Sequence, residues 1–230
     1  VGEQPAQGLV AVELADLDAR LRARRPAEVP GLPRFWGGAV GYFAYDVVRQ
    51  IERLPRGPEP DLELPDGLFL FTDVVLAIDN LRGRAMAIAA VEVEPGLGDE
   101  ELRERYDEAA QRTAALVRRL TESEPPPPLA LAPEPDADPA VESSMTRDAF
   151  EAAVERVREY IHAGDAFQVV LSQRLAVPLG PSPFDVYRAV RTLNPSPYLF
   201  FLELDGVSLV GSSPEVLVRL EDGTVTVRPI

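Results

Sequence analysis

A proline-rich, acidic stretch at residues 123–145 limits what this chain can fold into. It contains four consecutive prolines, Pro125 to Pro128, and a run of acids and prolines from Glu134 to Pro139. Proline stiffens the backbone and like charges repel, so such a stretch does not join a packed core. We predict an extended linker here, with a proline-rich docking site as the other interpretation. It separates an amino-terminal α+β region at residues 1–122 from the start of a second domain at residues 146–230.

The composition of the 230 residues excludes several classes of function. A net charge of −15 argues against a nucleic-acid partner. No run approaches the roughly 18–20 apolar residues that span a membrane, so we expect a cytoplasmic protein with no membrane partner. The sequence has no cysteine, and its 23 basic residues are all arginine. A cysteine nucleophile and a lysine base or Schiff base are therefore excluded within these residues.

Periodicity and capping residues predict helices that alternate with short strands. Apolar residues at three- and four-residue steps predict a helix over 99–122, which we expect to pack on its own sheet rather than on a partner. Thr146 is expected to cap the next helix, and Gly164 to end it in the left-handed conformation. Ser182 and Pro183 are expected to begin another. A further helix is predicted over 14–25, and strands over 68–78, 84–94, 166–177, 198–204, 207–211, 216–220 and 224–228.

The first glycine-rich run is Gly37-Gly38-Ala39-Val40-Gly41-Tyr42. Its spacing is not G-x-G-x-x-G, and no βαβ unit closed by an acidic residue follows it, as a dinucleotide site would require. We therefore interpret these glycines as sites of close backbone packing rather than as a phosphate cradle.

Three segments of the second domain combine polar residues with rigid turns. Gln168 interrupts the apolar run in GDAFQVVLSQR, and a buried amide without a partner costs about 1–3 kcal/mol. In the NPSPYL segment (Asn194–Leu199), two prolines make a turn stiff enough to hold neighbouring groups against a ligand. In the SSPE segment (Ser212–Glu215), the following Val216-Leu217-Val218 predicts a buried strand beside Glu215.

In this order and spacing, the three segments resemble the chorismate-utilising enzymes and, within them, the component I (large-subunit) anthranilate synthases. Gly37–Arg49 and Leu70–Asn80 are similar to the amino-terminal region of that family. The resemblance covers most of the chain apart from residues 92–145. It implies an α+β fold of two packed, largely antiparallel sheets with helices on the outside. It also implies an incomplete chain, without a short amino-terminal portion and the carboxy-terminal half.

The resemblance implies a lyase reaction in tryptophan biosynthesis. Ammonia would add at C2 of chorismate, the 4-hydroxyl would leave, and pyruvate would be eliminated to give anthranilate. A glutamine amidotransferase subunit (component II) would release the ammonia. Mg2+ would hold the substrate carboxylate through ligands beyond Ile230. Residues 1–230 alone are therefore expected to have no turnover, measured as an absence of anthranilate production.

The resemblance also assigns catalytic roles to Gln168 and Glu215. Relatives that add water have a lysine base at the position of Gln168, and an amide cannot act as a base. Gln168 therefore favours ammonia as the nucleophile, and a glutamine satisfied inside the sheet is the alternative. Glu215 matches the glutamate that protonates the departing hydroxyl, a role that requires a pKa raised by burial or by a neighbouring carboxylate. An exposed glutamate at a strand end is the alternative.

Asn194, Pro197, Tyr198 and Leu199 match the family segment that binds L-tryptophan as a feedback inhibitor, with leucine where methionine is usual. Two other interpretations stay open, namely aminodeoxychorismate synthase component I and a non-catalytic protein that binds tryptophan or a partner. Residue 231 would distinguish the three. Alanine there favours anthranilate synthase, lysine favours the aminodeoxychorismate enzyme, and a stop codon favours the binding protein.

Overall fold

The computed structural model describes residues 9–55, 57, 62–130 and 140–228. The chain divides into two units, one of Val1–Pro127 with Phe200–Leu209 and the other of Pro128–Leu199 with Val210–Ile230. The division falls inside the predicted linker. Residues 124–130 of that linker form no helix or strand, whereas a two-residue strand, β6 (Glu142–Ser143), lies within its last part. The second acid and proline run, Glu134 to Pro139, lies outside the described residues.

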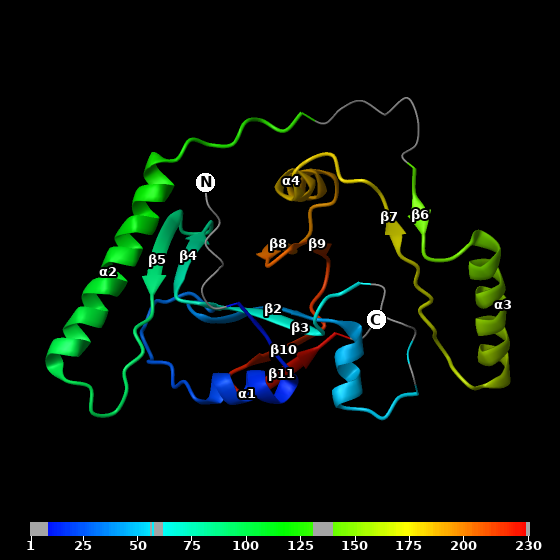
Figure 1. The fold of residues 1–230 in the computed structure, drawn as a ribbon, viewed down its shortest axis with the longest axis horizontal. Helices are drawn as coiled ribbons and strands as arrows, with labels where there is room; N and C mark the ends of the chain where they lie inside the picture. Colours follow the sequence, from blue (N-terminus) through cyan, green and yellow to red (C-terminus); the bar gives the residue numbers. More distant parts are fainter. Residues whose placement is uncertain (1–8, 56, 58–61, 131–139, 229–230) are drawn as a thin grey trace. The chain divides into compact units, whose positions relative to one another are not determined.

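The described residues of the first unit up to Pro127 form two antiparallel sheets and two α-helices (Figure 1), and the unit also includes the turn end of a later hairpin, at Phe200–Leu209. One sheet has the order β1-β3-β2, and the other is a hairpin of β4 and β5. The predicted strand over 68–78 is therefore two strands of different sheets, interrupted at Asp73, an exposed charged residue in an apolar run. The elements are β1 (Leu9–Ala11), α1 (Leu14–Arg22), β2 (Gly38–Phe43), a 3-10 helix η1 (Tyr45–Gln50), β3 (Gly67–Thr72), β4 (Val74–Asp79), β5 (Arg84–Ala89) and α2 (Asp99–Glu122).

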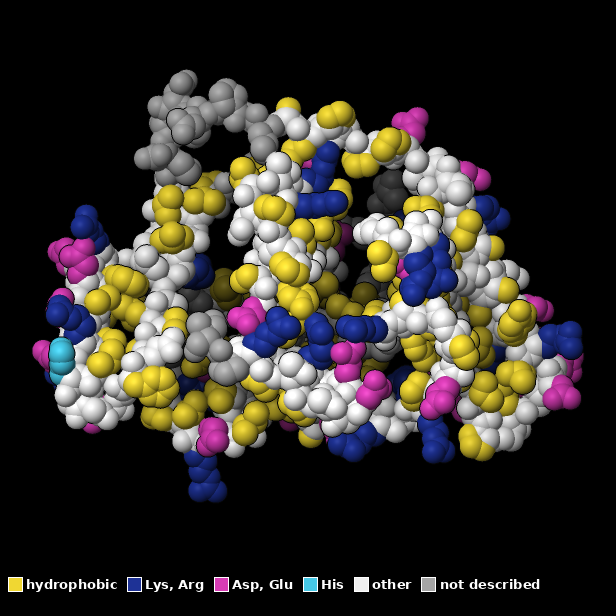
Figure 2. Space-filling model, turned by 180° about the vertical axis from the view of Figure 1, so that it is seen from behind, with side chains coloured by type: hydrophobic (Ala, Val, Ile, Leu, Met, Phe, Trp, Pro, Cys, Tyr) yellow, Lys and Arg dark blue, Asp and Glu magenta, His cyan; other side chains and the backbone are white. Residues whose placement is uncertain are grey.

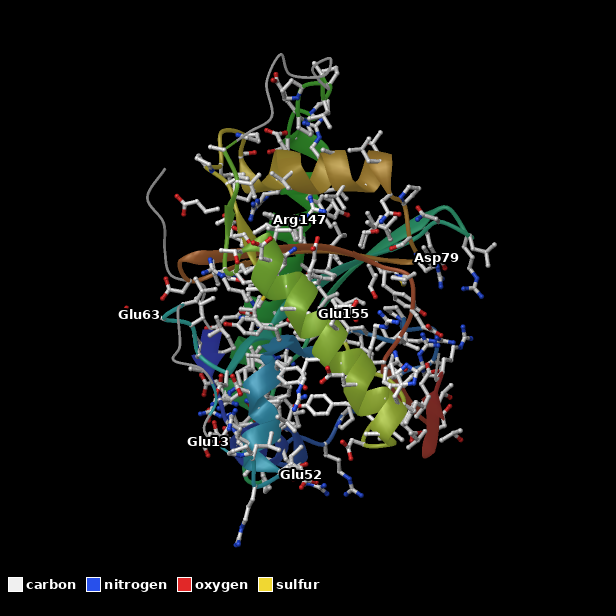
Figure 3. The ribbon with its side chains drawn as sticks, turned by 90° about the vertical axis from the view of Figure 1, so that its right-hand side faces the viewer. Glu13, Glu52, Glu63, Asp79, Arg147 and Glu155 are labelled. Carbon is white, nitrogen blue, oxygen red and sulfur yellow. The ribbon has the colours of Figure 1, made fainter. Side chains whose placement is uncertain are left out.

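Helix α2 packs on the hairpin of β4 and β5, as predicted (Figure 1). Its Ala109 is buried, and a small side chain at this position lets the helix approach the strands closely. The hairpin turn brings Asp79 at the end of β4 within ion-pair distance of Arg82 and Arg84, at 3.1 and 3.4 Å (Figure 3). Gly83 in this turn has a φ of 62°, which glycine adopts at little cost.

The close backbone packing predicted for the glycine-rich run occurs at Gly41 of β2. A Cβ on this residue would lie 2.7 Å from the Cα of Phe69 and would overlap the carbonyl group of Leu68. Both neighbours are backbone atoms of β3, which pairs with β2 through Gly41 and Phe69. The strands lie too close together at this point for any side chain.

Replacing Gly41 with alanine is therefore expected to lower the free energy of unfolding by about 1–3 kcal/mol. The added methyl group can be accommodated only by parting β2 from β3. Urea unfolding of the full-length protein would measure the change. Gly37→Ala is the matched control, because a Cβ there meets no atom of the described residues within 4 Å. Equal stability of the two variants would contradict the close packing.

The second unit contains two α-helices among its described residues, and each is capped by a side-chain hydroxyl, as predicted. The Thr146 side chain accepts a hydrogen bond from the backbone N–H of Ala149 at 3.3 Å, and Gly164 ends the helix with a φ of 83°. The first helix is α3 (Arg147–Ala163), whose exposed surface carries Arg147 and Glu155 (Figure 3). The other elements are β7 (Leu175–Ala176), α4 (Pro183–Leu193), β10 (Val218–Glu221), β11 (Thr224–Val227) and the open end of a hairpin formed by β8 (Tyr198–Leu204) and β9 (Val207–Ser213).

Two strand predictions in this unit are wrong. Of the predicted strand over 166–177, only β7 forms, and it pairs with β6. The predicted buried strand over 216–220 begins at Val218, and Leu217 is 89% exposed. An apolar run forms a buried strand only where a partner strand and a covering layer exist, and the sequence pattern reports neither. Figure 2 shows many such apolar side chains exposed between charged ones.

The predicted α+β class is confirmed. The pairs β1–β3, β2–β3, β4–β5, β6–β7 and β10–β11 are all antiparallel. Within the described part of the chain, no helix combines the length and apolar character needed to cross a membrane.

Candidate functional site

Helix α4 leads directly into the NPSPYL segment. Ser182 caps the helix by accepting a hydrogen bond from the backbone N–H of Asp185 at 3.1 Å, and Pro183 is its first residue. At the other end, the N–H of Asn194 still donates to the carbonyl of Val190 at 2.9 Å. Pro195 has no N–H and cannot continue the helix. The helix therefore ends at a defined residue and directs the next four residues into β8.

The cap of α4 makes this helix sensitive to acid. The hydroxyl of Ser182 donates to Asp185 at 2.8 Å, and with the guanidinium of Arg188 it holds the pKa of Asp185 below its ordinary value of 3.8. A lowered pKa in the folded state means that the ionised carboxylate stabilises the fold above about pH 4. This contribution is lost as the pH falls through the lowered pKa.

Asp185→Asn should therefore make stability less dependent on pH between about 6 and 3. Thermal unfolding of both proteins across this range would measure the difference. We expect the melting temperature of the wild type to fall more steeply below pH 4 than that of the variant. Parallel curves would contradict the assigned role of Asp185.

The hairpin of β8 and β9 brings the NPSPYL and SSPE segments together. Its strands are joined by Asp205 and Gly206, and Gly206 has a φ of 74°. Because the loop has only two residues, the start of β8 and the end of β9 lie at the same open end of the hairpin. NPSPYL enters β8 there, and SSPE leaves β9 there (Figure 1).

Two serine hydroxyls, those of Ser196 and Ser212, cross-link these two segments. Ser196 donates to the carbonyl of Ser213 at 2.8 Å, and Ser212 donates to the carbonyl of Asn194 at 2.6 Å. The hydroxyl oxygens of Ser196 and Ser212 lie 2.8 Å apart. Within SSPE, the hydroxyl of Ser213 donates to the carbonyl of Glu215 at 3.0 Å. The turn before β8 and the residues around Glu215 are therefore held in one hydrogen-bonded cluster.

A further hydrogen bond ties Tyr198 to β10. The guanidinium of Arg219 donates from Nη2 to the phenolic oxygen of Tyr198 at 3.1 Å. Tyr198 is 37% exposed, so part of its ring is open to a ligand. An arginine beside an exposed aromatic ring can bind a planar ligand that carries a carboxylate.

The predicted site residues fall into two groups. Asn194, Pro197, Tyr198 and Leu199 lie together at the junction of α4 and β8, and Glu215 lies half-buried just after β9. Gln168 is exposed in the irregular segment between α3 and β7, and the prediction that it is buried in a strand was wrong. Its neighbours Phe167 and Val170 are 93% and 81% exposed. No hydrogen bond between described residues links Gln168 to either of the other segments.

Sequence reasoning missed Ser196, Ser212, Ser213 and Arg219. The usable signal was the Asp205-Gly206 turn, which places the serines of the two segments at one end of the hairpin. The contact between Arg219 and Tyr198 carried no such signal, because 21 residues separate them.

The described residues do not fit the Mg2+ ion that the resemblance implies. Among them, no cluster of three or more histidine, cysteine, aspartate or glutamate side chains is arranged to hold a metal ion. Carboxylates are the usual protein ligands of Mg2+.

Comparison with known proteins gives consistent matches. A family model described as chorismate binding enzyme matches residues 2–230. Anthranilate synthase component 1 of Pseudomonas aeruginosa is 46% identical over 205 residues, which are 88% of this chain and 40% of that protein. The Pseudomonas putida protein of the same name is 45% identical over 207 residues, or 89% of this chain and 41% of that protein.

The crystal structure of anthranilate synthase component I from Streptococcus pneumoniae TIGR4 has a similar fold. The TM-score is 0.73 at 27% sequence identity, over 92% of this chain and 46% of that chain. This similarity confirms the predicted fold. The chain spans about two fifths of the length of the two Pseudomonas proteins.

Proposed function

This chain belongs to the chorismate binding enzyme family, and on that premise we propose that it is part of an anthranilate synthase component I. The full-length protein would convert chorismate and ammonia into anthranilate and pyruvate in tryptophan biosynthesis. The observation that carries the proposal is the hydrogen-bonded cluster of NPSPYL and SSPE at one end of the hairpin. It joins the segment proposed to sense the end product to the segment proposed to do the chemistry.

Glu215 is the proposed general acid. Loss of the 4-hydroxyl from chorismate requires a proton on the departing oxygen, so that water leaves rather than hydroxide. The position of Glu215 supports the role, because this residue is half-buried just after β9 and lies beside the hydrogen-bonded serines. Its backbone is held by the hydroxyl of Ser213, which limits the directions in which the side chain can point.

Gln168 is the proposed selector of the nucleophile. Its amide cannot remove a proton from water, whereas neutral ammonia attacks without a base. Its exposed position in the irregular segment leaves the amide free to face a ligand. Addition of ammonia at C2, with loss of the 4-hydroxyl as water, gives an amino intermediate. Loss of the C2 proton and of the enolpyruvyl group, which leaves as pyruvate, then makes the ring aromatic.

L-Tryptophan is the proposed feedback inhibitor, bound by Asn194, Pro197, Tyr198 and Leu199. The exposed ring of Tyr198 offers a surface for stacking an indole, and proline and leucine supply apolar contacts. Mg2+ belongs to the proposal as a cofactor of the full-length protein, with ligands other than the described residues.

The source of nitrogen tests the proposal together with its partner. The full-length protein, purified alone, should produce blue anthranilate fluorescence from chorismate, Mg2+ and ammonium at alkaline pH. With glutamine in place of ammonium, residues 1–230 should release no ammonia themselves, because they contain no cysteine nucleophile, and a glutamine amidotransferase is expected to supply it. Chorismate consumed with ammonium but without fluorescence would contradict the proposed product.

A further inference from the structure

The contact between Ser196 and Ser212 differs from an ordinary pair of serine hydrogen bonds. The two hydroxyls make three short oxygen contacts: with each other at 2.8 Å, with the carbonyl of Ser213 at 2.8 Å, and with the carbonyl of Asn194 at 2.6 Å. A hydroxyl has a single hydrogen to donate. Two hydrogens therefore serve three contacts, and one contact lacks a hydrogen at any moment.

Two arrangements of these hydrogens use the contact between the hydroxyls. In one, Ser212 donates to Ser196, which donates to the carbonyl of Ser213, so this row of hydrogen bonds ends on SSPE. In the other, Ser196 donates to Ser212, which donates to the carbonyl of Asn194, so the row of hydrogen bonds ends on NPSPYL. Each arrangement releases the carbonyl that the other one holds. Hydrogen bonds in such chains strengthen one another, so the two ends do not act independently.

We propose that Ser196 and Ser212 form a serine bridge that couples ligand binding at NPSPYL to the position of Glu215. A ligand that contacts Asn194 and Tyr198 and moves the carbonyl of Asn194 favours one of the two arrangements of these hydrogen bonds. The change makes or breaks the hydrogen bond from Ser196 to the carbonyl of Ser213, two residues before Glu215. A coupling of this kind needs an element with two arrangements that both sites bias, and the bridge is such an element.

Arg219 acts on the same bridge from the ligand side. Its guanidinium donates to Tyr198 at 3.1 Å. Arg219 lies in β10, which begins at Val218, three residues after the end of SSPE. A ligand carboxylate would compete for this guanidinium, because charged acceptors form stronger hydrogen bonds than a phenol does. Binding of an amino acid at Tyr198 therefore affects SSPE by two routes. One runs through the serine bridge, and the other runs through Arg219 in β10.

The coupling is measured as a ratio of two dissociation constants, and this part of the inference rests on the proposed function. Calorimetry on the full-length protein without ammonium gives the Kd of L-tryptophan with and without chorismate. We expect chorismate to weaken tryptophan binding by about tenfold in the wild type. In Ser212→Ala and Ser196→Ala the ratio should fall to about one, because the chain between the segments is broken.

Two variants control for effects on folding. Ser208→Ala removes a hydroxyl from the same face of β9, four residues earlier, where the hydroxyl has no hydrogen bond to any described residue. It should keep the ratio of the wild type. Ser212→Thr keeps the hydroxyl and should restore the ratio. A ratio in Ser212→Ala equal to that of the wild type would overturn the serine bridge.

Hydrogen exchange tests the bridge without any ligand or activity. Amides of residues 194–199 and of residues 213–217 should both exchange faster in Ser212→Ala than in Ser208→Ala, because both segments lose a partner. Unchanged exchange in either segment would overturn the bridge. If the wild type makes no anthranilate and binds no tryptophan, the proposed function fails, and the exchange result alone then decides for or against the bridge.

Discussion

Glu215→Gln is expected to lower the rate of chorismate conversion by the full-length protein by about 10²- to 10⁴-fold. The amide keeps the size of the side chain but has no proton to give to the departing hydroxyl. Tryptophan binding should be unchanged, because the residues proposed to bind it, Asn194 and Pro197–Leu199, are intact. Steady-state rates from anthranilate fluorescence, together with calorimetry for tryptophan, would measure both effects.

A matched variant separates this effect from a general loss of negative charge. Glu203 lies on β8 of the same hairpin and is exposed, and no hydrogen bond or ion pair joins it to another described residue. Glu203→Gln should keep the rate within about twofold of the wild type, as surface substitutions usually do. If Glu215→Gln also keeps the wild-type rate, Glu215 is not the general acid.

Tyr198→Ala is expected to raise the tryptophan concentration for half-inhibition by about 30-fold or more, since truncating an aromatic residue at the centre of a binding site costs roughly 2 kcal/mol. The substitution removes both the ring and the acceptor of the Arg219 hydrogen bond. The uninhibited rate should change far less. Inhibition curves at a fixed chorismate concentration would measure the shift.

Two further substitutions show which part of Tyr198 matters. Tyr198→Phe keeps the ring and loses only the hydroxyl, which frees the Arg219 guanidinium for a ligand carboxylate, so it should not weaken inhibition. Tyr45→Ala truncates a tyrosine of η1 that is 91% exposed, and it should leave inhibition unchanged. Wild-type inhibition in Tyr198→Ala would remove NPSPYL from the feedback site.

The features predicted correctly are those that depend on residues close together in sequence. Helix α2 has the predicted bounds, and the caps Thr146, Gly164 and Ser182 lie at the predicted ends of α3 and α4. Capping joins a side chain to a backbone group two or three residues away, so the sequence contains the whole interaction. Strand β8 was predicted for the same reason, since the proline turn and the Asp205-Gly206 turn bound it on both sides.

The features that were missed depend on distant partners. GDAFQVVLSQR has the residues of a buried strand, but the described structure forms only the two-residue strand β7, Leu175–Ala176, just after it. The break at Asp73 depends on β3 and β4 pairing in different sheets, which no local pattern encodes. The candidate site shows the same limit. Its two segments were recognised, but the serine contacts between them depend on how the hairpin ends meet.

Nitrogen-15 labelling tests the central claim most directly. The full-length protein would be given chorismate, Mg2+ and nitrogen-15 ammonium, and its products would be measured by mass spectrometry. An anthranilate synthase component I gives one labelled anthranilate and one pyruvate for each chorismate consumed, and added L-tryptophan suppresses both. A labelled amino product without pyruvate, or chorismate that is not consumed, would contradict the account.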